Sequence, residues 1–165
     1  KMRNKKVLLI VQAALIAAIY VVLTCFISAF NLASGAIQVR ISEALTILPV
    51  FTPAAIPGLF IGCLLSNLLT GCMPLDVVFG SLATLIGACG TYALRKHNWL
   101  APLPPIVANT IIVPFVLAYV YMAEGTIPFF MLTVGIGEVI SCYVLGIILY
   151  KVLNNYRSVI FKNED

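Results

Sequence analysis

Long apolar stretches occupy nearly the whole of this chain and are separated by short polar segments. Of its 165 residues, 62% are hydrophobic and 10% are charged, and the mean hydropathy is +1.08. A soluble domain needs a polar surface that this composition does not provide. A helix needs about 20 mostly apolar residues to cross a bilayer, so there is room for five or six crossings and little else. The sequence predicts an all-α integral membrane protein with a single membrane domain, residues 1–165.

Four apolar stretches are easily delimited, whereas the region 41–71 is not. It is too long for one untilted helix, and Pro49, Pro53 and Pro57 lie within it. Because proline ends or bends a helix, we expect two segments that meet near Thr52–Pro53, the first of them short for a full crossing. The six expected spans cover residues 6–28, 42–52, 54–71, 75–94, 100–122 and 127–150.

The basic residues favour six crossings over five. Lys and Arg gather in the cytoplasmic segments of membrane proteins. With six spans and a cytoplasmic start, nine of the ten basic residues lie inside and only Arg40 lies outside, whereas five spans would place six of the ten outside. We therefore expect six transmembrane helices with both termini cytoplasmic. For the same reason the net charge of +4 indicates membrane-flanking segments rather than a nucleic-acid partner.

Two carboxylates, Glu43 and Glu138, lie inside the apolar stretches. An acid at mid-membrane costs roughly 2.5–3.5 kcal/mol on insertion scales, so it usually faces a polar cavity, a partner charge or a substrate. Glu138 lies near the middle of the last expected span, close to glycines that allow a flat ligand or another backbone to approach. We favour a ligand contact for Glu138 over a helix-packing carboxyl.

The segment 38–45 is the most polar one between the first two spans and contains Gln38, Arg40 and Glu43. Arg40 and Glu43 are three residues apart, which places them on one face of a helix. On these two residues alone, an interfacial ion pair is slightly favoured over contact with a ligand. The preceding loop, residues 31–36, is uncharged and contains a glycine, so it is a candidate lid.

Other polar residues have competing interpretations. Asn67 and Asn109 lie deep in the third and fifth spans, where an amide suits the edge of a heterocyclic base but serves equally well as a hydrogen bond between helices. Asp76 follows Pro74 and is interpreted as a cap of the fourth span. The five cysteines show no C-x-x-C spacing, so the sequence indicates neither a zinc site nor a disulfide framework, and we expect no metal.

The first span contains two overlapping pairs of small residues, Ala13 with Ala17 and Ala14 with Ala18. Such pairs allow another helix to approach closely, either inside the protein or from a separate membrane protein. No G-x-x-x-x-G-K-[ST] phosphate loop is present, and one histidine cannot build an H-E-x-x-H or Ser-His-Asp arrangement. We therefore expect a binding subunit that is not an enzyme and takes its energy from partners.

The chain resembles the substrate-binding S components of energy-coupling factor (ECF) transporters, and specifically their queuosine-precursor subfamily, QueT. The resemblance runs over essentially the whole length. It is carried by the alanine pairs of the first span, by the run Val39–Leu45 continuing through Leu48–Pro49, and by the stretch Asp76–Thr84. The alanine pairs are characteristic of S components generally, whereas the Arg-x-x-Glu-Ala-Leu region is the more specific signal.

The resemblance implies a six-helix bundle in the bacterial plasma membrane that binds a queuosine precursor, 7-aminomethyl-7-deazaguanine, from outside. It implies a site in the outer half, under the loop that joins the first two spans, and no cofactor in this chain. It also implies docking of the alanine strip on a transmembrane coupling subunit. That partner carries two ATPase subunits, which use the ATP, and the S component topples in the membrane to deliver its substrate.

The residues suit such a ligand. A deazaguanine presents N–H donors that a carboxylate accepts in bidentate fashion, and its aminomethyl group is an ammonium. We predict that Glu43 and Glu138 take these two tasks, in an order that the sequence does not assign. The remaining predicted substrate-binding residues are polar or aromatic: Asn109, Asn67, Gln38, Arg40, Asp76 and Tyr143. Arg40 fits only if it pairs with Glu43 or bonds the ring oxygen, and Phe79, Tyr119 or Tyr143 would supply an aromatic platform.

Three alternatives stay open at this point. The chain could be an S component for another vitamin or a purine-like base. It could be a small ion or proton-coupled channel in which Glu138 relays protons. It could also be a scaffold that only organises partner helices.

Overall fold

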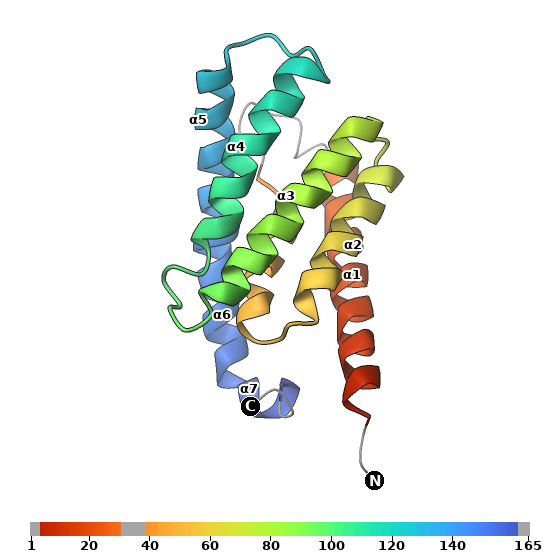
Figure 1. Cartoon of the computed structure of the whole chain (residues 1–165), viewed down its shortest axis with the longest axis vertical. Helices are drawn as coiled ribbons and strands as arrows, with labels where there is room; N and C mark the ends of the chain where they lie inside the picture. Colours follow the sequence, from red (N-terminus) through yellow and green to blue (C-terminus); the bar gives the residue numbers. More distant parts are fainter. Residues whose placement is uncertain (1–3, 31–38, 162–165) are drawn as a thin grey trace.

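The computed structural model describes residues 4–30 and 39–161, and every regular element within them is a helix (Figure 1). This confirms the all-α prediction for the described residues. The elements in chain order are α1 (Lys5–Ala29), η1 (Ile41–Val50), α2 (Ala55–Leu69), α3 (Pro74–Ala93), α4 (Leu103–Tyr119), α5 (Ile127–Glu138), η2 (Val139–Leu145), α6 (Gly146–Asn155) and α7 (Arg157–Ile160).

The helices lie where the apolar stretches predict them. By length and composition, α1, α3 and the continuous rod Ile127–Asn155 are each able to cross a membrane. The segments η1, α2 and α4 are apolar but only 10–17 residues long. The start of α1 and the end of α6 lie at the same end of the molecule (Figure 1). Six crossings and cytoplasmic termini stay predictions.

Local signals in the sequence set where the helices begin. Asn4 caps α1, because its side-chain oxygen accepts a hydrogen bond of 3.2 Å from the backbone N–H of Lys6. Thr126 caps α5 in the same way, with a bond of 3.4 Å from Phe129 N. Three helices, α3, α4 and α5, carry a proline in the first two positions. Proline is tolerated there because the missing N–H would have no helical partner.

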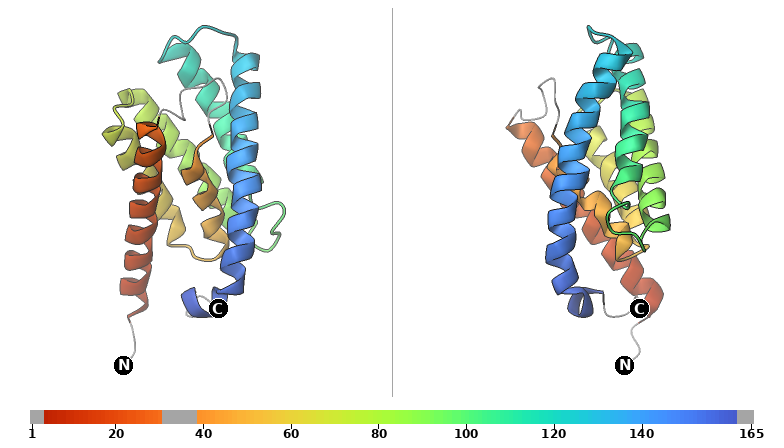
Figure 2. Two further views of the ribbon diagram at one scale, coloured as in Figure 1. Left: turned by 180° about the vertical axis from the view of Figure 1, so that it is seen from behind. Right: turned by 90° about the vertical axis from the view of Figure 1, so that its left-hand side faces the viewer.

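The 3₁₀ helix η1 forms the centre of the bundle. Nine of its ten residues are buried, and it packs against α1, α2, α3, η2 and α6. Figure 2 shows it enclosed between α1 and the α5–α6 rod. A 3₁₀ helix rises about 2.0 Å per residue, so these ten residues reach roughly 20 Å, about 5 Å more than an α-helix would. The short segment predicted here therefore extends deep into the protein.

The chain turns between η1 and α2 at the predicted junction. Thr52 Oγ1 donates to Gln12 Oε1 at 3.0 Å, which ties the turn to α1. The same hydroxyl accepts from the backbone N–H of Ala54 at 3.2 Å. The threonine side chain thus provides a hydrogen-bond acceptor for a backbone N–H in a turn where proline interrupts the helix.

Glycines allow α1 and α2 to approach each other very closely. A Cβ added at Gly58 would lie 2.8 Å from Ala13 O, and one added at Gly62 would lie 2.9 Å from Tyr20 Cβ and 3.1 Å from Ala17 Cα. These distances are shorter than van der Waals contact, so both positions need glycine at the present helix separation. Close contact of this kind drives helix association in membranes, where no hydrophobic effect acts between helices.

We predict that Gly62→Ala lowers stability, although alanine is the better helix former by about 1 kcal/mol. Overpacking against Tyr20 and Ala17 typically costs about 1–3 kcal/mol. Thermal unfolding of the detergent-solubilised protein measures the loss as a midpoint several degrees lower. Gly146→Ala is the matched control, because its Cβ would meet its nearest atoms at 3.8 Å. Equal midpoints for the two variants would contradict the packing described here.

Candidate functional site

Glu43 and Glu138 meet inside the bundle. Glu43 lies on η1 and Glu138 is the last residue of α5. One carboxylate oxygen of each acid and the Sγ of Cys142 all lie within 4.8 Å of one another. Glu43 is 2% exposed and Glu138 is 7% exposed. The structure therefore brings together the two acids that the apolar sequence singled out, in a place shielded from solvent.

One oxygen of Glu43 is held by the protein and the other is not. The Tyr20 hydroxyl donates to Glu43 Oε1 at 2.5 Å, and Tyr20 is itself 1% exposed. Glu43 Oε2 is buried and has no hydrogen-bond partner among the described residues. A buried carboxylate oxygen without a donor is costly. Oε2 is therefore the atom at which a ligand N–H would gain most.

Glu138 shows the same division between its two oxygens. Asn109 Nδ2, from α4, donates to Glu138 Oε2 at 2.9 Å. The thiol of Cys142 donates to the same oxygen at 3.2 Å. Within the described part of the chain, Oε1 accepts no hydrogen bond. Each acid is thus oriented through one oxygen and presents the other to a potential donor.

The backbone next to Glu138 departs from the α-helix. Residues Val139–Leu145 form the π-helical segment η2, which leads directly into α6. A π segment adds a residue to the turn and is frequent at functional sites. Here Ser141 Oγ accepts from the backbone N–H of Arg40 at 3.1 Å, which joins η2 to the start of η1. The contact fixes the elements that carry the two acids relative to each other.

Arg40 does not form the ion pair that its spacing from Glu43 suggested. In the described part of the structure neither acid is within ion-pair distance of it, and Tyr20 hydrogen-bonds the carboxylate of Glu43 instead. The Arg40 side chain lines a small cavity of about 70 Å³ together with Thr24, Ile27, Ser28, Ser42 and Asn67. Ligand pockets usually measure roughly 300–1,000 Å³. The cavity therefore has room for a few atoms and not for a bicyclic base.

Asn67 and Gln38 are not placed beside the acids. Asn67 is buried on α2 and donates to Cys63 Sγ at 3.6 Å. It shares the small cavity with Arg40, and neither acid accepts a hydrogen bond from it in the described structure. Gln38 and the candidate lid, residues 31–36, lie outside the described residues. A role for Asn67 or Gln38 in ligand binding stays a prediction.

Asp76 does not cap α3, so the capping interpretation is wrong. The N-cap position belongs to Met73, which makes no side-chain cap bond. Asp76 Oδ2 accepts from the Tyr121 hydroxyl at 2.6 Å, and that hydroxyl accepts from Met73 N at 3.2 Å. Asp76 therefore links the start of α3 to the segment after α4, at the end of the bundle opposite α7 (Figure 1).

The expected aromatic platform is only partly where the sequence suggested. Phe79 and Tyr119 are 44% and 70% exposed and line an outward-facing apolar groove between α3 and α4. They are not placed to stack on a ligand at the acids. Tyr143 is half-buried on η2, next to Cys142, and its role stays a prediction. Among the described residues, the aromatic side chain that hydrogen-bonds one of the two clustered acids is Tyr20.

Sequence reasoning missed Tyr20 and Cys142. Tyr20 was absorbed into the first apolar span, although a phenol in such a helix needs a partner when it is buried. Cys142 is one of the five cysteines for which the sequence indicates neither a zinc site nor a disulfide. Its spacing of four residues from Glu138 was a readable signal, because such residues are neighbours on a helix.

The cluster of two acids and a thiol also has the spacing of metal ligands. A metal would need the thiolate, whereas the Cys142 thiol is the donor to Glu138 Oε2. Structural zinc sites moreover use four protein ligands. The arrangement is better suited to a ligand that brings its own N–H donors.

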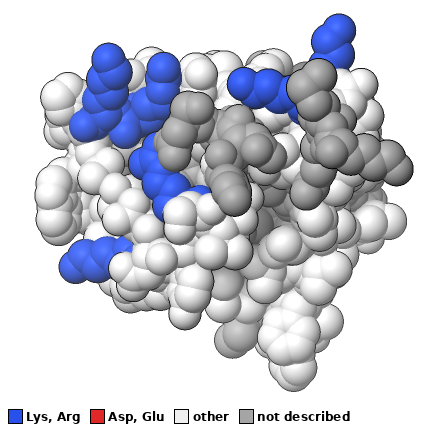
Figure 3. Space-filling view, turned by 90° about the horizontal axis from the view of Figure 1, so that it is seen from below, with Lys and Arg blue, Asp and Glu red and all other residues white. Residues whose placement is uncertain are grey.

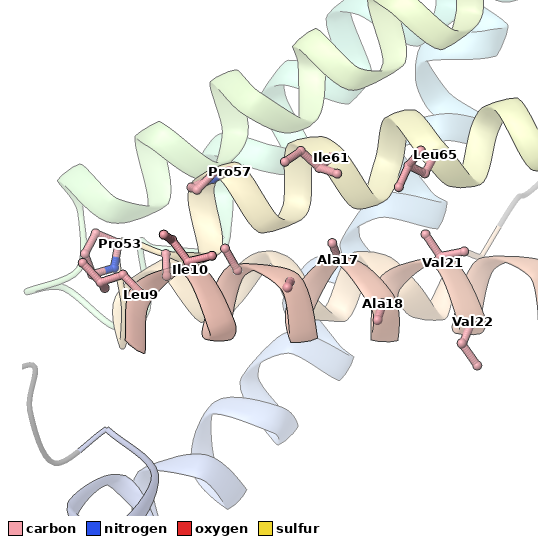
Figure 4. Close-up of a pocket in the computed structure, with 13 residues that line it drawn as sticks. Leu9, Ile10, Ala17, Ala18, Val21, Val22, Pro53, Pro57, Ile61 and Leu65 are labelled. Atoms are coloured by element: carbon pink, nitrogen blue, oxygen red, sulfur yellow. The ribbon is translucent and has the colours of Figure 1, made fainter. Parts of the chain in front are cut away.

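The structure divides the alanine strip of α1 into two faces. Ala13 and Ala17 pack against Gly58 and Gly62 of α2, and Ala17 is 8% exposed. Figure 4 shows Ala17 on the side of α1 toward α2 and Ala18 on the side turned away. Ala14 and Ala18 are both exposed. The packing interpretation therefore holds for one pair and leaves the other open to a partner.

An apolar groove of about 900 Å³ runs along α1 and α2 (Figure 4). The four alanines of the α1 strip line it, together with the other apolar residues Leu9, Ile10, Val21, Val22, Pro53, Ala54, Pro57, Ile61 and Leu65. Tyr20 points from the same helix into the core. One helix thus contributes to the buried site on one face and to the groove on another.

Comparison with known proteins now identifies the family. A family model described as QueT transporter matches residues 10–155. The chain belongs to this family. The match includes both acids and the whole of the alanine strip. QueT proteins are transporters and not enzymes, and the long apolar helices of this chain agree with a membrane protein.

One curated relative is the "Queuosine precursor transporter QueT" of Lactococcus lactis subsp. cremoris (strain MG1363). It is 38% identical to this QueT-family chain over 85 residues, which make up 52% of this chain and 50% of the relative. The matched region therefore spans about half the length of that protein. No solved structure matches the chain.

We predict that Tyr20→Phe destabilises the protein, because it leaves both oxygens of Glu43 without a donor in a buried place. A hydrogen bond to a charged group contributes about 1.5–3 kcal/mol. The thermal unfolding midpoint in detergent should fall by several degrees. Tyr119→Phe removes a hydroxyl from a side chain that is 70% exposed and should leave the midpoint unchanged. A similar midpoint for both variants would show that the Tyr20–Glu43 contact contributes little.

Proposed function

We propose that this chain is the substrate-binding S component of an ECF-type importer and captures 7-aminomethyl-7-deazaguanine from outside the cell. Membership of the QueT family and the name of the Lactococcus relative, a queuosine precursor transporter, support the substrate. One structural observation carries the proposal: two buried acids from different helices each present an oxygen that lacks a donor from the described residues.

The chemistry of the ligand matches these two oxygens. The ring N–H and exocyclic amine of a deazaguanine donate to one carboxylate, and the ammonium of the aminomethyl group donates to the other. Asn109 orients Glu138 and Tyr20 orients Glu43, so the acids lose little side-chain freedom on binding. Preorganisation of this kind increases affinity because the ordering cost is met during folding.

Charge balance explains why Arg40 belongs in such a site. With both acids ionised, the charges of Glu43, Glu138 and Arg40 sum to −1. A singly charged cation brings the total to zero, and buried charges are tolerated when they are paired. Arg40 therefore reduces the net negative charge of the site to −1, which suits a ligand that carries one positive charge. The small volume beside Arg40 implies that the elements around the acids part when the ligand enters.

Energy would come from partners. Ala14 and Ala18 face outward in an apolar groove, which suits close approach by a helix of a transmembrane coupling subunit. Two ATPase subunits bound to that partner would use the ATP, and this chain would need no cofactor. In the proposed topology six helices cross the bacterial plasma membrane with both termini in the cytoplasm, and the chain topples to release its substrate inside.

We predict that Glu43→Gln and Glu138→Gln each weaken binding of radiolabelled precursor by tenfold or more. Glutamine keeps the size of the side chain but removes the charge and half of the acceptor capacity. A parallel titration uses a deazaguanine whose 7-substituent is uncharged. Substitution of the acid that pairs with the ammonium should weaken binding of the charged ligand only. Substitution of the other acid should weaken binding of both ligands.

Glu124→Gln is the control, because Glu124 is exposed in the loop before α5. It should bind the precursor as the wild type does. Wild-type affinity in both acid variants would remove these residues from the site. Tighter binding of another vitamin or purine-like base would support the S-component role but contradict the proposed ligand.

We predict that the double variant Ala14→Leu, Ala18→Leu binds the precursor normally but no longer supports ATP-driven uptake in cells that contain the ECF module. The added side chains would project into the groove and leave the α1–α2 contact intact. Ala17→Leu is the comparison, because Ala17 packs on Gly62 and its enlargement should reduce folding and binding together. Equal loss of binding and uptake in the double variant would argue for internal packing alone.

A further inference from the structure

We infer that a basic cavity at the Lys5 end of the bundle and the apolar groove along α1 and α2 together hold one anionic phospholipid. The phosphate of the headgroup lies in the cavity and one acyl chain lies in the groove. This inference requires only that the protein lies in a membrane. It is independent of the substrate.

The cavity measures about 600 Å³, and cations from three separate elements line it. Lys5 comes from the start of α1, Arg95 and Lys96 follow the end of α3, and Arg157 begins α7. No acid is among its lining residues in the described part of the chain. Lys5, Arg95 and Lys96 place like charges around one cavity, and an anion between them is attracted by all three. Phosphate is the anion that Lys and Arg bind best in this way.

Among the described residues, Lys and Arg gather at the end of the molecule around the cavity. Figure 3 shows Lys and Arg side chains over this face, with no Asp or Glu visible among the described residues. Arg95 is held in position, since its Nη1 donates to Tyr92 O at 3.0 Å and its guanidinium lies 4.2 Å above the Tyr92 ring. The other guanidinium N–H groups remain as donors for a phosphate oxygen. The cavity is thus a formed site and not a fringe of mobile lysines.

The cavity lies beside the apolar groove. Leu9 and Pro53 line both of them. Along α1 the groove runs from Leu9 to Val22, roughly 20 Å at 1.5 Å per residue. Half of the hydrocarbon core of a bilayer is about 15 Å thick. A phosphate site beside a groove of this length fits an acyl chain of one leaflet, whereas free phosphate would use only the cavity.

The expected position of the cavity in the membrane agrees with an anionic phospholipid as its ligand. The basic end is the cytoplasmic end by the positive-inside rule, and anionic lipids of the cytoplasmic leaflet attract such clusters of Lys and Arg. On the proposed function the same groove receives the coupling subunit. The lipid would then occupy it only in the uncoupled protein.

Native mass spectrometry of the purified full chain, with added phosphatidylglycerol or phosphatidylcholine, tests the inference. We expect one phosphatidylglycerol to be retained per protein with at least a tenfold preference over phosphatidylcholine. The variant Arg95→Gln, Lys96→Gln should lower that preference at least fivefold. The control Lys6→Gln, Lys151→Gln removes two cations that do not line the cavity and should behave as the wild type. Thermal unfolding midpoints check that the variants are folded. If the double variant does not fold, the single variant Lys96→Gln replaces it in the lipid-binding measurement.

Two further experiments distinguish a phospholipid from a small phosphate compound without acyl chains. Glycerol 1-phosphate, the headgroup phosphate without acyl chains, should not displace the lipid at equal concentration. Ala18→Phe, which fills the groove, should weaken retention of phosphatidylglycerol. Equal retention of both lipids, equal loss in the cavity and control variants, or full displacement by glycerol 1-phosphate would each overturn the proposal.

Discussion

The close approach of Glu43 and Glu138 is the constraint on which the rest of the structure depends. Two acids inside an apolar bundle are tolerated only if donors surround them, and the protein supplies donors to one oxygen of each. Tyr20 serves Glu43, while Asn109 and Cys142 serve Glu138. This incomplete hydrogen bonding leaves Glu43 Oε2 buried without a donor from the described residues, and the proposed ligand would supply one.

Irregular helices bring the acids together. Glu43 lies on a buried 3₁₀ helix, and Glu138 lies at the boundary between α5 and the π segment η2. Such backbone is tolerated at membrane depth where protein surrounds it. The greater rise of η1 carries its residues farther into the bundle than ten α-helical residues would reach, and the contact between Arg40 N and Ser141 fixes η1 against η2.

Helix α1 joins the two functional regions of the molecule. Tyr20 faces the core and holds Glu43, Ala17 packs against α2, and Ala14 and Ala18 face the groove. A single helix can serve three neighbours because side chains three and four residues apart share a face while those between them do not. The contact with a buried acid, the packing against α2 and the outer apolar surface are thereby distributed around one element.

The sequence by itself determined that the chain is a helical membrane protein, that it turns near Thr52–Pro53, and that Glu43 and Glu138 are the residues to explain. These properties follow from hydropathy, proline and the cost of a buried charge, which act locally. Only the tertiary structure decided that Tyr20 reaches Glu43 across 23 residues and Asn109 reaches Glu138 across 29. It also decided which alanines face inward. Such contacts depend on how each helix is rotated, and the 3₁₀ and π segments change that rotation in a way that a regular period of 3.6 residues does not predict.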